Sequence, residues 1–348
     1  MRGASLGLRL VQSAARMSRR GMMRRSGITA VSVSLTLLAA GCHVPGISSG
    51  LAGSQQITVA DVPGFEDAPL QVAIRDGLFA RRGVSVTVQT YGTLRQAYAA
   101  LTSGQAQVVS GDYAGLLYMQ AHAGREPLRL ITDGYDATSG LMEVLTLPGS
   151  AIRAPQDLEG AAVATPPPEL AAFSADAPYN TETLATESVL QSDGVSPSSV
   201  QWKAMAPGSM ISALRDHTVS AIVTTEPYVL QAETQLGAVE LFDACSGVTA
   251  NLPLSGYFTT AGFASGHAAA LRGFQAALNA AKAGTAQLGA VQSVLRTLPG
   301  MSAREAALVT IGQYPTFMSV GQVQRVADLM YGTGMIRTTI SVRGLVFR

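Results

Sequence analysis

The stretch that decides the fold runs from Ile57 to Gly92 and reads ITVADVPGFEDAPLQVAIRDGLFARRGVSVTVQTYG. Residues 57–60 form a short β-rich run, and residues 61–66 form a loop that contains a proline and a glycine. Asp67 can cap a helix, and residues 84–89 alternate apolar with polar side chains, as a half-buried strand does. The stretch therefore predicts a strand–loop–helix–strand unit. Its first loop would lie at the edge where open α/β sheets bind ligands.

The loop and helix of this unit carry a longer motif, P-x-x-x-x-A-P followed by V-A-x-x-x-G-x-F-x-x-x-G. The sequence supplies its fixed positions as Pro63, Ala68, Pro69, Val72, Ala73, Gly77, Phe79 and Gly83. On these residues the chain resembles the solute-binding proteins of ABC importers for sulfonates, nitrate, taurine and thiamine-precursor pyrimidines.

Three later segments resemble further signatures of the same family, in the same order along the chain. Residues 100–112 resemble A-L-x-S-G-x-x-D-x-x-x-G-D, residues 157–165 resemble D-L-x-G-x-x-V-x-x, and residues 214–228 resemble L-x-x-G-x-V-D-A-x-x-x-x-E-P-Y. The departures from these signatures are Gln107, the prolines at 166–168, His217 and Ser220. The resemblance covers about residues 57–340.

The resemblance implies an α/β, two-lobed fold of the periplasmic-binding-protein type (type II, venus flytrap). Lobe 1 would comprise residues 57–136 and 253–348, and lobe 2 would comprise residues 137–252. Helices expected at 268–283, 303–311 and 323–331 would cover lobe 1.

The first 41 residues have the features of a secretion signal. They hold seven arginines and no acidic residue, and their apolar run at 28–40 is too short for a bilayer core of about 30 Å. Residues 38–42, Leu-Ala-Ala-Gly-Cys, resemble a lipoprotein signal in which the Cys42 thiol takes a diacylglycerol and becomes the mature N-terminus. Residues 18–24 also resemble a twin-arginine signal, so the export route stays open. Residues 42–56 would form a lipid-anchored, flexible tether.

Charge and cysteine content exclude some classes of protein. Without its first 41 residues, the 348-residue chain keeps 17 basic and 23 acidic residues, which argues against a nucleic-acid partner. With Cys42 acylated, Cys245 has no cysteine to pair with and is expected in the core. A monomer is expected.

The sequence lacks the common signatures of catalysis and cofactor binding. It contains no P-loop, dinucleotide fingerprint, C-x-x-C pair or H-E-x-x-H motif. Its four histidines are scattered, and lysine occurs only at 203 and 282. No cofactor, metal site or catalytic residue is therefore predicted.

Polar and aromatic side chains in the loops at the expected cleft edge are the candidates for ligand binding. Aromatic walls could stack a planar or apolar group while a few acids orient it. Each acid could instead cap a helix, and each tyrosine could be a core residue with a satisfied hydroxyl. The candidates are Pro63, Asp67, Tyr91, Asp112, Tyr113, Tyr135, Asp136, Thr165, Tyr179, Asn180, Glu226, Tyr228 and Tyr257.

The charge of these candidates predicts the class of ligand. They include four acids and no arginine or lysine, so an anionic ligand would meet unpaired carboxylates in a poorly solvated site. A neutral or cationic solute is expected, such as an aromatic or heterocyclic amine of the pyrimidine kind. Glu226 and Asp112 would accept its hydrogen bonds.

Together these features predict an extracytoplasmic, lipid-anchored binding protein that is not an enzyme. It would hand a small organic solute to an ABC permease driven by its ATPase. Two alternatives stay open. One is an enzyme on the same two-lobed fold, of the pyrimidine-synthesis or menaquinone-pathway type, and the other is a surface solute sensor.

Overall fold

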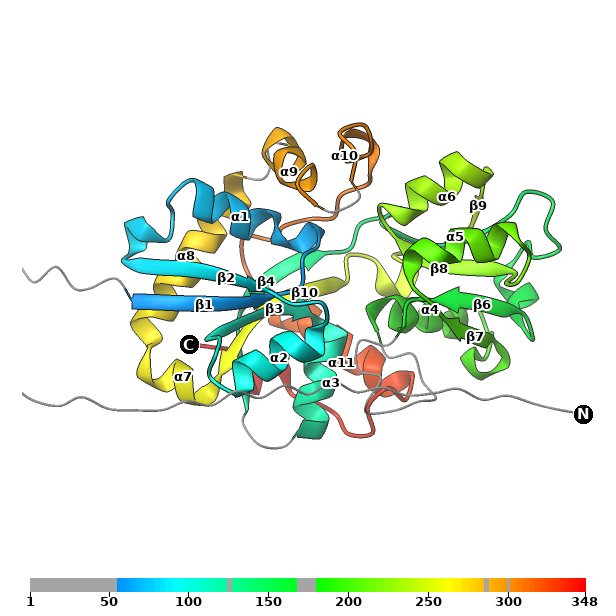
Figure 1. Cartoon of the computed structure of the whole chain (residues 1–348). Helices are drawn as coiled ribbons and strands as arrows, with labels where there is room; N and C mark the ends of the chain where they lie inside the picture. The colour runs from blue at the N-terminus through cyan, green and yellow to red at the C-terminus, as the bar shows by residue number, and fades with distance from the viewer. Residues whose placement is uncertain (1–54, 124–126, 168–179, 285–287, 299–300) are drawn as a thin grey trace, which may run out of the picture. The chain divides into compact units, whose positions relative to one another are not determined.

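The computed structural model describes residues 55–123, 127–167, 180–284, 288–298 and 301–348. The predicted signal peptide, the tether, Cys42 and Tyr179 lie outside these ranges. Residues 50–348 belong to one compact unit, in which two five-stranded sheets organise the described part of the chain (Figure 1).

The first sheet has the strand order β2-β1-β3-β10-β4. Its strands are β1 (Gln55–Asp61), β2 (Val84–Thr90), β3 (Val108–Asp112), β4 (Leu128–Asp136) and β10 (Pro253–Thr260). Strand β1 pairs in parallel with β2 and β3, whereas β10 runs antiparallel to both β3 and β4. The predicted strand–loop–helix–strand unit is confirmed. The chain also returns to the first sheet after residue 251, as expected.

Helices cover both faces of this sheet, because the crossovers after β1 and β2 run in opposite directions across it. The helices are α1 (Ala68–Arg75), α2 (Leu94–Thr102), α3 (Tyr113–Ala123), α8 (Ala268–Gly284) and α11 (Val320–Gly332). Helix α1 packs against α8, and α11 packs against α3 (Figure 1). Pro69 lies in the first turn of helix α1, where a missing N–H costs no hydrogen bond.

The second sheet has the order β7-β6-β8-β5-β9. Its strands are β5 (Met142–Thr146), β6 (Ala162–Thr165), β7 (Gln201–Ala204), β8 (Ala221–Thr225) and β9 (Val239–Asp243). Strands β6, β7 and β8 are parallel, while β5 runs antiparallel to β8 and β9.

Two separate apolar cores lie on the two faces of the second sheet. Successive residues of a strand face opposite sides, so Val144 joins one core and Leu145 the other. Helices α5 (Pro207–Arg215) and α6 (Tyr228–Leu236) contribute side chains to the core that contains Leu145. Helix α4 (Thr181–Ser192) contributes Leu190 to the core that contains Val144. Burial of both faces explains the apolar runs that begin the central strands β6 and β8, whereas the edge strands β7 and β9 carry charged residues.

The C-terminal part differs from the sequence expectation at one helix. The expected helix at 303–311 is only α10 (Glu305–Leu308), after which Val309 adopts an extended conformation. The backbone then pairs with β4, since Asp136 and Gln313 exchange both of their backbone hydrogen bonds. Extended pairing with a strand end therefore replaces the last turn of the expected helix. Helices α7 (Ala261–Gly266) and α9 (Leu288–Leu295) complete this part.

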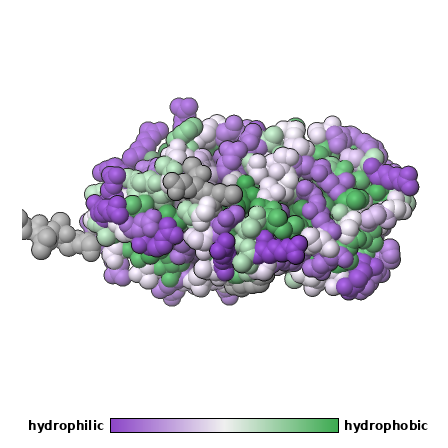
Figure 2. Space-filling model, turned by 90° about the horizontal axis from the view of Figure 1, so that it is seen from above, coloured by the Kyte–Doolittle hydropathy of each residue, from purple (hydrophilic) through white to green (hydrophobic). Residues whose placement is uncertain are grey.

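Among the described residues, no helix is both long and apolar enough to cross a membrane. Figure 2 shows a face on which hydrophilic and hydrophobic residues are intermixed.

Candidate ligand-binding cleft

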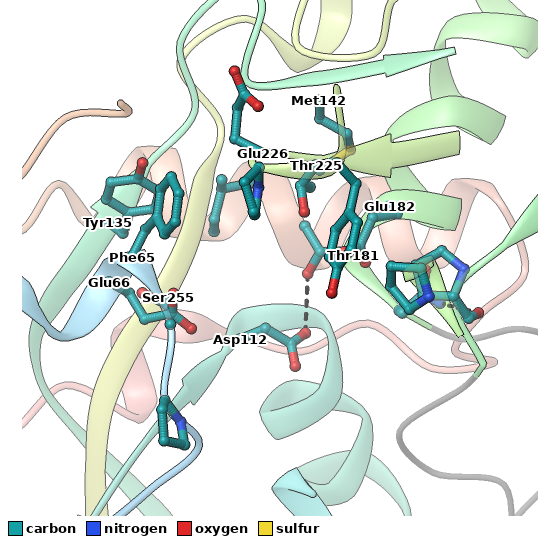
Figure 3. Close-up of a pocket in the computed structure, with 18 of the residues that line it drawn as sticks. Phe65, Glu66, Asp112, Tyr135, Met142, Thr181, Glu182, Thr225, Glu226 and Ser255 are labelled. Carbon is teal, nitrogen blue, oxygen red and sulfur yellow. Dashed lines mark hydrogen bonds between the residues drawn. The ribbon is translucent and has the colours of Figure 1, made fainter. Parts of the chain in front are cut away.

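A cleft of about 820 Å³ is lined by residues from the elements of both sheets (Figure 3). Its walls are built at the carboxyl ends of β1, β3, β6 and β8 and at the adjoining starts of β5 and β10. This is the edge at which open α/β sheets bind ligands, because loops and helix N-termini face outward there. The volume falls in the range of small-molecule sites, which is about 300–1,000 Å³.

Six of the predicted site residues line the cleft, and six lie elsewhere. The lining residues among them are Pro63, Asp112, Tyr135, Asn180, Glu226 and Tyr228. The six that do not line it are Asp67, Tyr91, Tyr113, Asp136, Thr165 and Tyr257. Tyr179 is outside the described residues. Whether the six lining residues bind a ligand stays a prediction.

Three of the residues away from the cleft are buried and make a hydrogen bond or a ring contact elsewhere. Asp67 is buried at the start of α1, where its Oδ2 accepts a 2.6 Å hydrogen bond from Gly64 N–H. Tyr113 is fully buried and donates its hydroxyl hydrogen to Asp133. Tyr257 is buried against Phe274, with a ring-centroid distance of 5.9 Å. Capping and core packing therefore account for these side chains.

The other three likewise have local structural roles. Tyr91 donates a 3.0 Å hydrogen bond to Gln89 Oε1. Thr165 is fully buried, and its hydroxyl lies 3.0 Å from that of Thr183 in α4. Asp136 pairs through its backbone with the C-terminal segment. A loop position at a strand end therefore does not by itself direct a side chain into the cleft.

Sequence reasoning missed several residues that line the cleft. Among them are Phe65, Glu66, Arg95, Met142, Thr181, Glu182, Thr225 and Ser255. The expectation that no arginine or lysine lies at the cleft is wrong, because Arg95 in the first turn of α2 contributes to its wall. A signal was available for Glu182, since it follows the capping residue of a helix at the binding edge.

Asn180 and Thr181 fix the start of α4 at the cleft. Asn180 Oδ1 accepts a 2.7 Å hydrogen bond from Thr183 N–H, and its amide donates at 2.9 Å to the carbonyl of Pro166. The next residue, Thr181, donates from its hydroxyl to Asp112 Oδ1 at 3.0 Å (Figure 3). The same oxygen of Asp112 accepts a 2.7 Å bond from Gly115 N–H in the first turn of α3. Asp112 therefore links helices of the two lobes.

Glu226 at the end of β8 makes two bonds to backbone groups. Its Oε2 accepts from Leu230 N–H at 3.1 Å in α6, and its Oε1 accepts from Thr310 N–H at 3.0 Å. The carboxylate thus joins α6 to the segment that follows α10. Both oxygens already accept a hydrogen bond from the backbone. A ligand that donates to Glu226, as predicted, would therefore compete with the N–H groups of Leu230 and Thr310.

Burial and mutual repulsion raise the pKa of the carboxyl groups along the cleft. For Glu66 the pKa rises to about 7, chiefly because of burial and also because of the charges of Asp61, Asp112 and Glu182. The pKa of Glu182 likewise rises to about 7 through burial and the nearby charge of Asp112. Burial also raises the pKa of Asp112 and of Glu226. The cleft is therefore a site in which added negative charge is unfavourable.

The NMT1/THI5-like family model matches residues 65–287, which is well over half of the chain. The chain belongs to this family. The match begins just before α1 and spans strands β2 to β10, and it includes most of the lining residues described above, although not Pro63. No curated protein matches the sequence.

Solved structures with the same two-lobed fold cover most of the described chain. The periplasmic aliphatic sulphonate binding protein SsuA from Escherichia coli is 18% identical, with a TM-score of 0.68 over 84% of this chain and 97% of that chain. The alkanesulfonate-binding protein SsuA from Xanthomonas axonopodis pv. citri, bound to MOPS, is 18% identical, with a TM-score of 0.64 over 85% and 99%. The desulfurization enzyme DSZB is 13% identical, with a TM-score of 0.62 over 84% and 96%. The fold is thus shared by binding proteins and by an enzyme.

Three residue types that often act in catalysis are absent from the described lining of the cleft. The described residues that line the cleft include no histidine, lysine or cysteine. No cluster of metal-ligating side chains occurs in the described ranges of the chain. Cys245 is buried, and burial raises the pKa of its thiol to about 12, which keeps it in the unreactive protonated form. What the geometry offers is a set of acceptors, hydroxyls and aromatic rings.

Proposed function

We propose that this protein is the solute-binding component of an ABC importer. In this role it captures a small organic solute between its two lobes and delivers the solute to a membrane permease. The observation that carries the proposal is the cleft itself, which draws its walls from both sheets and joins them by the Thr181–Asp112 hydrogen bond. Membership of the NMT1/THI5-like family and the fold shared with binding proteins support it.

The lobes of this proposal follow the sequence-based division of the chain. Lobe 1 comprises residues 57–136 and 253–348, and lobe 2 comprises residues 137–252. The connections near residues 137 and 252 would act as hinges that let the lobes close on a ligand. Attachment to the outer side of the cell membrane through a lipid on Cys42 is part of the same proposal, and so are export and the flexible tether.

An enzyme on the same fold is the less favoured alternative. The cleft offers carboxyl and hydroxyl groups but, among its described residues, no activated nucleophile paired with a base. Binding without chemical change needs only shape, apolar walls and a few directed polar groups, and the cleft has these.

A solute screen followed by scattering tests the proposed function. A thermal-shift screen of small organic solutes should find compounds that raise the melting temperature, because a ligand that binds only the folded state stabilises it by RT ln(1 + [L]/Kd). Small-angle scattering with a compound from this screen should then give a smaller radius of gyration than without it. Turnover of that compound, or an unchanged scattering profile at saturation, would contradict solute capture by lobe closure.

A further inference from the structure

Three carboxyl groups converge on the cleft from three different elements. Glu66 belongs to the 3-10 turn before α1, Asp112 ends β3, and Glu182 lies in the first turn of α4 (Figure 3). The charge of Asp112 is among the causes that raise the pKa of both Glu66 and Glu182. The three groups therefore lie within electrostatic reach of one another.

No basic side chain appears among the main causes of the altered pKa of Glu66 or Glu182. Arg95 lines the same cleft from α2, yet burial and neighbouring carboxylates decide the state of these two acids. Asp112 gains some stabilisation of its charge from the Thr181 hydroxyl and the Gly115 N–H. Burial and the neighbouring carboxylates therefore favour the protonated form of Glu66 and Glu182, and a positive charge placed beside them would favour the ionised form.

A buried hydroxyl beside these acids points independently to a ligand. Ser255 on β10 lines the cleft, is only 3% exposed, and its Oγ has no hydrogen-bond partner. Buried polar atoms are rarely left unpaired, because desolvation without a new bond costs free energy. A bound ligand at this wall would supply the missing partner.

Strand pairing places this hydroxyl in the same row as an acid and an aromatic ring. Ser255 is directly opposite Asp112 on β3 and directly opposite Tyr135 on β4. The ladder between β10 and β4 is irregular on both sides of Ser255, but all three residues line the cleft. The wall thus presents a carboxylate, a hydroxyl and an aromatic ring in series, with Phe65 and Tyr228 also in the lining. Aromatic faces attract cations through their quadrupole.

We propose that the solute is a small organic cation with at least two N–H groups. The carboxyl groups of Glu66, Asp112 and Glu182 accept hydrogen bonds from these N–H groups, and the hydroxyl of Ser255 bonds to the same ligand. This inference rests on the proposed function and names its ligand class. A sulfonate head group in the same place would add a negative charge to three carboxyl groups. The aromatic and apolar walls would hold the carbon skeleton of the cation.

Calorimetry with head groups of opposite charge tests the inference. The cationic probes are 2-phenylethylamine, agmatine and histamine, and the anionic probes are 2-phenylethanesulfonate and butanesulfonate. 2-Phenylethylamine and 2-phenylethanesulfonate carry the same aromatic body. At least one cation should bind at millimolar concentration or tighter. Its affinity should rise between about pH 6 and pH 8, because Glu66 and Glu182, with a pKa of about 7, lose their protons in this range.

Variants in α4 provide a matched comparison. Glu182→Gln should weaken binding of the cation about tenfold or more, and Ser255→Ala should weaken it several-fold. Glu187→Gln is the control, since Glu187 is in the same helix and burial also raises its pKa to about 7, but it does not line the cleft. This control should leave the affinity unchanged.

Three results would overturn the inference. If a sulfonate binds and none of the cations does, solute binding stands and the cationic ligand class is wrong. If the affinity for a cation falls as the pH rises, or if Glu187→Gln weakens binding as much as Glu182→Gln, the assigned carboxyl groups do not receive the ligand. If neither cations nor anions bind, the cationic ligand class is wrong, and the proposed function is decided separately by the solute screen.

Discussion

The hydroxyl of Thr181 donates a 3.0 Å hydrogen bond to Asp112 Oδ1, which joins the start of α4 in the second lobe to the end of β3 in the first. The two residues are 69 positions apart in the chain. The bond spans the cleft, so it can form only when the two lobes are close together. It is one contact through which closure and ligand binding can influence one another.

Removing this hydroxyl should weaken ligand binding more than it weakens the fold. Thr181→Val keeps the shape of the side chain but loses the bond, whose worth to a charged acceptor is about 1.5–3 kcal/mol when buried. We expect an affinity about ten- to a hundredfold lower and a nearly unchanged melting temperature without ligand. Calorimetry with a ligand from the solute screen measures the affinity. Thr181→Ser, which retains the hydroxyl, is the control. Equal affinities of the valine variant and wild type would show that the bond does not hold the closed state.

The pH dependence of stability should report the carboxyl groups of the cleft. Glu66 and Glu182 have a folded-state pKa of about 7 against an ordinary value of 4.5, so the folded state binds more protons between these values. The free energy of unfolding should therefore fall as the pH rises from about 4.5 to about 7. Above that range these two groups should cause no further change, and the stability lost should not be regained.

The double variant Glu66→Gln, Glu182→Gln should lose this part of the pH dependence and be more stable than wild type near pH 8. Urea unfolding at a series of pH values measures the difference. Glu305→Gln is a control of opposite sign, because hydrogen bonds lower the pKa of Glu305. A double variant that parallels wild type at every pH would refute the raised pKa values.

The start of α4 should depend on Asn180. Asn180→Ala removes the cap on Thr183 N–H and the bond to the Pro166 carbonyl. Loss of such a cap costs about 0.5–2 kcal/mol, so the urea midpoint should fall measurably. Asn180→Asp retains the capping oxygen and should lose less stability. Equal losses in both variants would place the stabilisation in the amide donor instead.

Anchoring should depend on Cys42. In cells, Cys42→Ala should leave the protein unprocessed or released from the membrane, because the thiol that takes the lipid is absent. Fractionation and intact-mass measurement of the wild-type and variant proteins test this. Cys245→Ala should leave attachment unchanged, since that thiol is buried within the folded part. Continued membrane attachment of the Cys42 variant, without a difference in lipid mass, would end the lipoprotein hypothesis.

The sequence by itself determined the fold class and the order of the main elements. The alternation at 84–89 and the proline and glycine positions at 61–77 are local signals, and the structure has β2, the loop and α1 where they predict them. Local propensity failed at 303–311, because the backbone after Val309 pairs with the end of β4. Such pairing depends on a strand that is far away in the sequence.

Only the tertiary structure decided which polar residues face the cleft. Asp67 lies in the turn after β1 and Asp112 ends β3, yet Asp67 is buried with its carboxylate bonded to Gly64 N–H, whereas Asp112 accepts a hydrogen bond from Thr181. Ser255 carries no motif and acquires its position by pairing with Asp112 and Tyr135. Periodicity fixes which face of its own element a side chain occupies. The partners that surround that face come from distant parts of the chain, so the composition of the cleft is set by packing.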